Sequence, residues 1–330
     1  MIVLGIETSC DETASAICKD GQILSSITST QEIHKKFGGV VPEIASREHD
    51  KLLNQMVSDT LNEAEISLSN LDGLAVTQGP GLMGTLLSGV SFAKGLSQGL
   101  NIPIIGINHL EAHIYANFLS EPNLEFPFIC LLVSGGHTQL WHIKNLGEYN
   151  ILGETRDDAA GEAFDKGARI LGLKYPGGPE IEKMAKEGDQ YSVNFPRPLM
   201  KEKNFEFSFS GLKTSLLYCI KENKIKNTSD IAASYQYAII EVLTTKLKWA
   251  AEAMDCDTCV IAGGVAANKL LRDHVKNLLP NHNIIFPEMS YCTDNAAMVA
   301  YLGEVYFNQE KQSELSLIHI SEPTRPRLIS

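Results

Sequence analysis

The order of predicted strands and helices repeats once along the 330-residue chain, and this repeat restricts the possible folds more than any other feature. Residues 2–29 contain three apolar segments separated by short polar turns, as in a β-meander, and residues 128–155 show the same pattern. In each half a helix, a strand, a glycine-rich turn, a second helix, a strand and a last helix follow. The period is far too long for a solenoid. The chain is therefore predicted to be a duplicated α/β protein of two lobes, with the functional site in the cleft between them.

The two copies are predicted to occupy residues 1–125 and 126–312. The second copy also contains an insertion of helices and loops at about 156–229. Residues 313–330 show no useful periodicity, and we expect them to be non-native or disordered. They do not enter the fold prediction.

Composition and charge limit the class of protein. The formal net charge of −12 argues against indiscriminate nucleic-acid binding. A local basic patch remains open at four residues that are otherwise solvated surface: Arg197, Lys201, Lys203 and Lys213. No segment reaches the ~18 apolar residues of a membrane span, and the N-terminus enters a strand pattern without a basic leader. The seven scattered cysteines favour a reducing compartment over a disulfide framework, so we expect a cytoplasmic protein without membrane association.

Two histidines four residues apart follow the apolar segment 102–107, which is typical of a buried strand. His109 and His113 begin a predicted helix with Asn108 as its N-cap, and residues four apart lie on one helical face. Two imidazoles placed in this way can hold one transition metal, whereas the alternative is a pair of surface histidines. Leu110 directly follows the first histidine, so the H-E-x-x-H motif of metalloproteases is absent from this segment.

An aspartate occupies the equivalent position in the second half. Asp294 begins the helix after the last predicted strand, as His109 and His113 do in the first half. Two equivalent corners that face one cleft would supply two imidazoles and a carboxylate to one metal. Such a set leaves coordination positions open, as a catalytic site requires.

Two glycine turns indicate a nucleotide. Ser134, Gly135 and Gly136 lie between two strands, where glycine backbone N–H groups can approach a phosphate closely. Gly263 and Gly264 lie between a strand and a helix, with Asn268 one turn further on, which suits a nucleoside near a helix N-terminus. Each turn alone can be an ordinary tight turn, but together, at matching topological positions, they favour nucleotide binding.

A second glycine pattern does not indicate a dinucleotide. Residues 79–84 match G-x-G-x-x-G, but a Rossmann site needs an acidic residue at the end of the next strand, which here ends in Ile107 and Asn108. Pro80 also removes a backbone donor from the turn. In the insertion, Asp165 is a candidate for binding ribose hydroxyls, with a plain solvated carboxylate as the alternative.

Seven motifs together resemble the TsaD family, the tRNA threonylcarbamoyladenosine transferases formerly called glycoprotein endopeptidases, over residues 1–312. The motifs are GIETSCDET at 5–13, GGVVPE at 38–43, HLEAH at 109–113, VSGGHT at 133–138, YPGGP at 175–179, FSFSGLK at 207–213 and GGVAAN at 263–268. The resemblance implies the actin-like, Hsp70-like ATPase (ASKHA) fold. It also implies transfer of a threonylcarbamoyl group from threonylcarbamoyl-AMP to the exocyclic amine of the adenosine 3′ of the tRNA anticodon, with release of AMP.

The resemblance also implies a set of ligands and partners. His109, His113 and Asp294 would bind one divalent metal, expected to be Fe2+ with Zn2+ as the alternative. The contacts to threonylcarbamoyl-AMP or ATP would come from Leu132, Val133, Ser134, Gly135, Gly136, Asp165, Gly178, Glu182 and Asn268. The family often has Asp where Glu182 stands. The implied partners are tRNA, a paralogous subunit of the same fold and a small P-loop ATPase, and the helix predicted at 82–99 is a possible docking face if it is not simply core.

The chemistry of this transfer agrees with the predicted site. The adenine amine is a poor nucleophile and needs an activated acyl donor, whose phosphate leaving group the metal and the glycine turn would hold. Asp11, Glu12 and His137 are candidates for accepting the amine proton, although Asp11 and Glu12 can also be mere turn formers. The alternatives are an ATPase or phosphotransferase of the same fold, a metalloprotease and a non-catalytic nucleotide-binding subunit.

Overall fold

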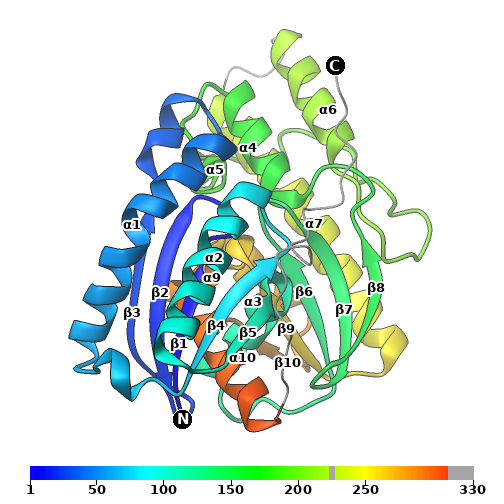
Figure 1. The fold of residues 1–330 in the computed structure, drawn as a ribbon. Helices are drawn as coiled ribbons and strands as arrows, with labels where there is room; N and C mark the ends of the chain where they lie inside the picture. Colours follow the sequence, from blue (N-terminus) through cyan, green and yellow to red (C-terminus); the bar gives the residue numbers. More distant parts are fainter. Residues whose placement is uncertain (223–226, 311–330) are drawn as a thin grey trace. The chain divides into compact units, whose positions relative to one another are not determined.

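A computed structural model of the chain describes residues 1–222 and 227–310, and the segment expected to be non-native lies outside these residues. The chain forms two compact units, each built on a five-stranded sheet (Figure 1). Unit 1 comprises Met1–Leu119 and the chain from Thr293 onward, and unit 2 comprises Ser120–Cys292. In the part of the chain that the structure describes, no helix is long and apolar enough to cross a membrane.

The sheet of unit 1 has the strand order β3-β2-β1-β4-β5. Its strands are β1 (Ile2–Glu7), β2 (Glu12–Lys19), β3 (Gln22–Thr30), β4 (Gly73–Gly79) and β5 (Ile104–Asn108). The first three strands pair antiparallel, as the predicted meander requires, while β4 pairs parallel to β1 and β5 pairs parallel to β4. Parallel pairs need a crossover connection, which α1 (Pro42–Glu63) and α2 (Met83–Leu100) provide.

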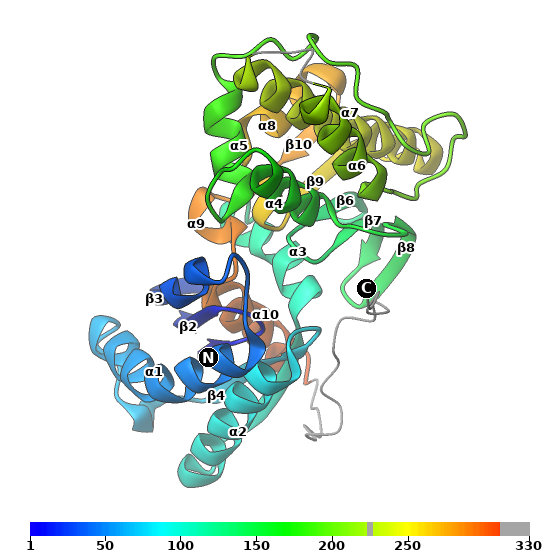
Figure 2. The same cartoon turned by 90° about the horizontal axis from the view of Figure 1, so that it is seen from above.

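Alternate residues of β1 face the two covered sides of this sheet. Leu4 and Ile6 belong to an apolar cluster with side chains of α1 and α2. Gly5 faces α10 (Ala296–Asn308), where a Cβ on Gly5 would lie 2.5 Å from the backbone N of Ala300. The absence of a side chain at Gly5 therefore lets α10 pack directly on the strand, on the face away from α1 and α2 (Figure 2).

The sheet of unit 2 has the equivalent order β10-β9-β6-β7-β8, so the predicted duplicated α/β fold is confirmed. Its strands are β6 (Phe128–Val133), β7 (Thr138–Asn145), β8 (Glu148–Glu154), β9 (Thr258–Ala262) and β10 (Asn283–Ile285). Every residue of β6 is buried, as expected for a central strand covered on both faces.

The helices of unit 2 include those of the predicted insertion, and their core surrounds α7, with Phe164 and Tyr235 among its largest buried side chains. They are α4 (Ala160–Ile170), α5 (Gly177–Ala185), α6 (Ser210–Lys221), α7 (Thr228–Met254), α8 (Lys269–Leu278) and α9 (Met289–Cys292).

The last helix departs from the predicted division of the chain. It was predicted to belong to the second copy, at residues 126–312, but α10 packs against β1, β2 and β4 of unit 1. The physical reason is the small-residue surface of β1 and β4: the Cβ of Ala75 lies where a side chain on Gly303 would need to be, 2.3 Å from its ideal Cβ. Because α10 packs in unit 1, Asp294, which lies just before it in the chain, is in the same unit as the two histidines.

Candidate metal centre and nucleotide-binding turns

His109 and His113 lie in the first two turns of α3 (His109–Ser120), which begins directly after β5. Asn108 caps the helix as predicted, because its side-chain oxygen accepts hydrogen bonds from the backbone N–H groups of Leu110 (3.0 Å) and Glu111 (3.2 Å). The two imidazole rings are 4.7 Å apart between centroids and nearly perpendicular. Both side chains are buried, at 7% and 1% exposed.

Asp294 lies beside both histidines, although not as the first residue of a helix. Asn295 is the N-cap of α10, its side chain accepting from the N–H of Met298 at 3.1 Å, and Asp294 directly precedes that cap. One carboxylate oxygen of Asp294, Oδ1, is 3.0 Å from Nε2 of His113 and 3.6 Å from Nε2 of His109. The three predicted ligands thus meet inside unit 1 rather than across two lobes.

The donor set of this cluster fits a divalent transition metal. All three ligand atoms lie within 4.8 Å of one another, and two ligands about 2.0–2.2 Å from one ion would themselves lie roughly 3–4 Å apart. Two imidazoles and one carboxylate suit zinc or iron and leave coordination positions open. Asp294 is the more exposed member, with 22% of its side chain accessible, so the cluster opens on that side.

Glu7 supports the cluster from the end of β1, a role that was not predicted. Its buried carboxylate lies 3.1 Å from Nδ1 of His109 and accepts from the Thr77 hydroxyl (2.6 Å) and the Ser9 backbone N–H (2.5 Å). Burial opposes ionisation, but the facing His109 holds the pKa of Glu7 below its ordinary value. An ionised carboxylate only accepts, so Nδ1 of His109 carries the proton and Nε2 is directed towards Asp294, as in carboxylate–histidine–metal arrangements.

Negative charge gathers around the cluster. Asp11 ends the turn after β1 and Glu12 begins β2, and burial together with Asp294 and Asp11 raises the pKa of Glu12 to about 10. Burial and the same carboxylates also raise the pKa of the Cys10 thiol. So many acidic groups repel one another strongly unless a cation neutralises them or one of them keeps its proton. Burial opposes protonation of His109, but Asp294 and Glu7 raise its pKa to about 9, so the cluster favours a positive charge, either on His109 itself or on a bound cation.

The glycine turn of unit 2 connects β6 to β7 and is held by Ser134. The Ser134 N–H donates to the carbonyl of His137 at 2.8 Å, and its hydroxyl accepts from the His137 N–H at 3.1 Å. Among the residues that the structure describes, no atom outside the turn lies within 4 Å of a Cβ placed on Gly135 or Gly136, so this side of the turn is open to that extent. Gly161 at the start of α4 packs beneath it, where a Cβ would lie 2.5 Å from the Ser134 carbonyl oxygen.

The second glycine turn lies beside the first at the carboxyl ends of two paired strands. β9 pairs parallel to β6, and Gly263 follows β9 with φ +87°, a conformation that favours glycine. A Cβ on Gly263 would lie 2.5 Å from the Val133 carbonyl oxygen, so glycine is required for this close approach. Both predicted turns are therefore at one edge of the sheet, where open α/β sheets place their ligands.

The other predicted nucleotide contacts already have structural partners. Asp165 accepts from the Gly177 N–H at the start of α5 (2.7 Å), and Glu182 accepts from the Lys269 N–H (3.0 Å). Asn268 caps α8 through the Leu271 N–H at 3.0 Å. The remaining predicted contacts are Leu132 and Val133, whose side chains are buried in β6, and Gly178, which has open space at its Cβ position. Their role towards a nucleotide stays a prediction.

Comparison with known proteins identifies the family. The model of the family described as tRNA N6-adenosine threonylcarbamoyltransferase matches residues 22–301. The chain is 55% identical to the tRNA N6-adenosine threonylcarbamoyltransferase of Thermosipho melanesiensis over 311 residues, 93% of this chain and 95% of that protein. It is 47% identical to that of Clostridioides difficile over 325 residues, 96% of each chain. This chain belongs to the tRNA N6-adenosine threonylcarbamoyltransferase family.

Solved structures with little sequence similarity confirm the fold of this transferase family member. HypF of T. kodakarensis superimposes with a TM-score of 0.64 at 16% identity, over 93% of this chain and 48% of that one. Component A of the Acidaminococcus fermentans (R)-2-hydroxyglutaryl-CoA dehydratase gives a TM-score of 0.57 at 16% identity, over 94% of this chain and all of that one. Both have the actin-like ATPase fold, as expected from the sequence motifs.

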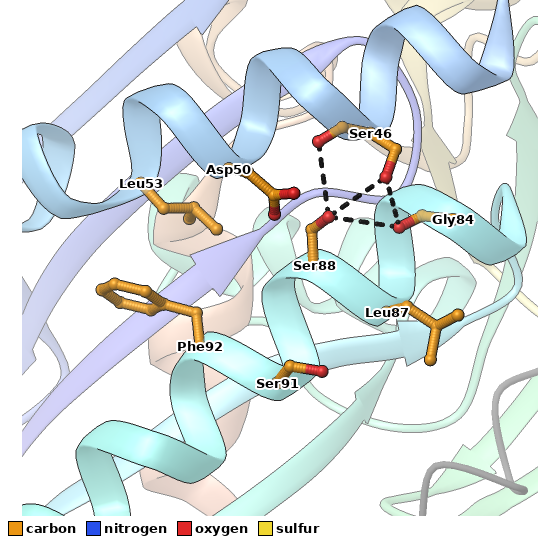
Figure 3. Close-up of a pocket in the computed structure, with 8 residues that line it drawn as sticks. All are labelled: Ser46, Asp50, Leu53, Gly84, Leu87, Ser88, Ser91 and Phe92. Atoms are coloured by element: carbon orange, nitrogen blue, oxygen red, sulfur yellow. Dashed lines mark hydrogen bonds between the residues drawn. The ribbon is translucent and has the colours of Figure 1, made fainter.

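A cavity of about 470 Å³ lies in unit 1 of the transferase, and Figure 3 shows the residues that line it. It is formed between α1 and α2, where the Ser46 hydroxyl donates to the Gly84 carbonyl at 3.0 Å and lies 3.2 Å from the Ser88 hydroxyl. Leu87 on its rim is exposed. Neither His109, His113 nor Asp294 lines this cavity, so it is a surface feature of the two helices rather than part of their cluster.

Proposed function

We propose that His109, His113 and Asp294 hold one divalent metal, Fe2+ in preference to Zn2+, in a chain that modifies tRNA. The activity is transfer of a threonylcarbamoyl group to the exocyclic amine of the adenosine 3′ of the anticodon. Threonylcarbamoyl-AMP is the donor and AMP the product. The observation that carries the metal assignment is the cluster itself, with Glu7 behind His109, in a member of the transferase family.

The reaction divides between an activated donor and groups that hold it. The attacking amine is a weak nucleophile because its lone pair is delocalised into the adenine ring. The carbamoyl carbon must therefore carry a good leaving group, which is the phosphate of AMP. We infer that the backbone N–H groups of Gly135 and Gly136, on the open side of this turn, bind phosphate oxygens of the nucleotide. When bound, the metal supplies a Lewis acid and positive charge for the leaving group. Asp165, Gly178, Glu182, Gly263, Gly264 and Asn268 are the proposed further contacts to the nucleotide.

Proton removal from the amine falls to Asp11, Glu12 or His137. Glu12 with a pKa near 10 is protonated at neutral pH and does not accept a second proton in that state. Its turn is braced by His49, whose ring nitrogens lie 2.8 Å from the Thr13 hydroxyl and 3.0 Å from the Cys10 carbonyl oxygen. This bracing would hold the acidic turn in place during the transfer.

Partners of the family extend the proposal. The transferase is proposed to act in the cytoplasm with a paralogous subunit of the same fold and a small P-loop ATPase. The exposed groove between α1 and α2 is a candidate docking surface for the paralogous subunit (Figure 3).

Transfer of labelled threonine into unmodified tRNA tests the proposed function. The assay contains synthetic threonylcarbamoyl-AMP, the chain and the proposed partners, and compares wild type, His109→Ala and the control His142→Ala on β7. We expect His109→Ala to lose bound metal and at least about 100-fold in transfer, because removing a ligand costs more than removing its outer partner. His142→Ala should keep both. Full transfer by metal-free protein would overturn the proposed role of the metal.

Two alternative activities can be measured in the same preparation. Phosphate release from ATP with and without tRNA would reveal an ATPase or phosphotransferase. A peptidase assay during metal titration would reveal a metalloprotease. Nucleotide binding without any of these activities would indicate a scaffolding subunit.

A further inference from the structure

Helix α6 presents a basic and aromatic surface in a strongly acidic chain. Its buried side holds Leu212 and Leu216, while Lys213, Leu217 and Lys221 are exposed and repeat at four-residue intervals along one face. Tyr218, with 60% of its surface accessible, lies next to this row. Residues 210–221 contain no acidic side chain, although the whole chain has a net charge of −12. We call Lys213, Leu217, Tyr218 and Lys221 the α6 face.

The N-terminus of α6 is fixed by a single carboxylate. Asp157 accepts hydrogen bonds from the Phe209 N–H (2.7 Å), the Ser210 N–H (3.1 Å) and the Ser210 hydroxyl (2.9 Å), and from the Ser208 hydroxyl. Partial burial disfavours ionisation, but these four bonds keep the pKa of Asp157 below its ordinary value. The serines of the FSFSG motif therefore attach α6 to the loop that precedes α4.

The segment before α6 is fixed as well. Lys246 is fully buried in α7, and its Nζ donates to the Leu199 carbonyl (3.0 Å) and to both the carbonyl and the side-chain oxygen of Asn204 (2.9 and 3.0 Å). Arg197, by contrast, is held by Glu241 at 2.6 Å and so does not join a free basic patch. The α6 face is thus presented by a rigid support, which lowers the entropic cost of binding a ligand.

We propose that the α6 face is a contact surface for tRNA, with Lys213 and Lys221 facing phosphates and Tyr218 stacking on an unpaired base. This inference rests on the proposed function, which makes a tRNA the acceptor. Charge complementarity favours this partner, because two ammonium groups on an acid-free helix attract a polyanion and sequence-tolerant stacking on tyrosine suits the bases of a single-stranded loop. Glu222 follows at the C-cap and is the nearest acidic residue in the chain order.

The test is the KM for unmodified tRNA in the threonine-transfer assay with all partner proteins present. Three variants change the α6 face: Lys213→Ala with Lys221→Ala, Lys213→Glu with Lys221→Glu, and Tyr218→Ala. The matched control removes two exposed lysines elsewhere in unit 2, by Lys144→Ala with Lys248→Ala. Circular dichroism and thermal unfolding establish that each variant is folded. The KM for threonylcarbamoyl-AMP is measured in parallel.

We expect Tyr218→Ala to raise the tRNA KM by at least about fivefold, as loss of one stacked base predicts, with little change in kcat. A plot of log(kcat/KM) against log[salt] has a negative slope, and the lysine-to-alanine pair should reduce its steepness by roughly 1–2. Charge reversal should weaken binding further. The KM for the donor and the control pair should not change. An unchanged tRNA KM and salt slope in folded alanine and glutamate variants would overturn the inference, as would an equal effect of the control pair. Absence of transfer by wild type would instead refute the proposed function.

Discussion

Replacement of Glu7 by Gln tests the organisation of the proposed metal centre at His109, His113 and Asp294. The two side chains have nearly the same shape, so packing against Ser9 and Thr77 is preserved. The amide oxygen can still accept from the Ser9 N–H, but the amide nitrogen then faces Nδ1 of His109, where the carboxylate oxygen was 3.1 Å away. An N–H donor at that position forces the tautomer of His109 that carries its proton on Nε2. That nitrogen is the one directed towards Asp294, so it can no longer bind a metal without losing the proton.

The expected cost follows from the loss of this outer partner. Substituting the hydrogen-bonding partner of a metal-binding histidine typically lowers metal affinity by about 10- to 100-fold, equivalent to roughly 1.4–2.8 kcal/mol. Glu7 has three hydrogen-bonding neighbours and no exposure to solvent, so we expect the upper part of this range. The free energy of unfolding of the metal-free protein should change less, because no cavity forms and the buried negative charge is removed.

Chelator competition followed by elemental analysis measures the effect, with Glu304→Gln as the matched control. Glu304 is also a buried carboxylate of unit 1, on α10, and accepts from the backbone N–H groups of Asp20 (2.7 Å) and Gly21 (2.8 Å). Its substitution should lower stability but leave metal affinity unchanged. Wild-type metal affinity in Glu7→Gln, or an equal loss in Glu304→Gln, would refute the assigned role of Glu7.

Three further substitutions have defined outcomes. Gly263→Ala should lower stability by at least about 1–2 kcal/mol in thermal unfolding, because φ is +87° and the new Cβ would meet the Val133 carbonyl oxygen, whereas Gly95→Ala in open space should not be destabilising. Burial lowers the pKa of Lys246 to about 8 from 10.5, so between about pH 8 and pH 10.5 the unfolded chain binds more protons than the folded chain. In urea unfolding, the stability of wild type relative to Lys246→Met should therefore rise with pH over this range, by up to about 1.4 kcal/mol per pH unit. A stability difference that does not change with pH would contradict the lowered pKa. Asp157→Ala leaves the donors of the α6 N-terminus unpaired and should cost about 1–3 kcal/mol, with faster hydrogen exchange in α6; unchanged exchange would exclude the anchoring role.

Local patterns in the sequence were sufficient for the elements and their order, because strand and helix periodicity are properties of neighbouring residues. They were also sufficient for the Asn108 cap and the two histidines on one face of α3, which depend on spacings of one to four residues. The unit to which α10 belongs could not be predicted in this way. It depends on which sheet offers a surface of small residues such as Gly5 and Ala75, and those residues lie more than 200 positions before α10 in the chain.

Glu7 carries a sequence signal for a buried partner that hydrophobic periodicity does not contain. An acidic residue at the end of an otherwise apolar strand is costly to bury unless it is paired, so its position alone indicates a buried partner. The partner could not be identified from sequence, because His109 is 102 residues away. It reaches Glu7 only once β4 has paired with β1 and β5 has paired with β4. A charged residue in a buried strand is therefore best treated as a candidate outer partner for any metal motif that follows a neighbouring strand.

The acidic surroundings of the histidines explain why the cluster is better suited to a cation than to a structural salt bridge. A buried His–Asp pair alone would be balanced in charge, but Glu7, Glu12 and Asp294 act on one another within unit 1, and Glu12 responds by retaining its proton up to a pKa of about 10. Such an arrangement is costly to maintain for stability alone, because apolar residues of similar size would pack without mutual repulsion. A divalent cation reverses this balance, since it attracts each carboxylate and favours their ionised forms. Metal binding should consequently release protons in calorimetry performed in buffers of different ionisation enthalpy, and no dependence on the buffer would argue against a cation at this cluster.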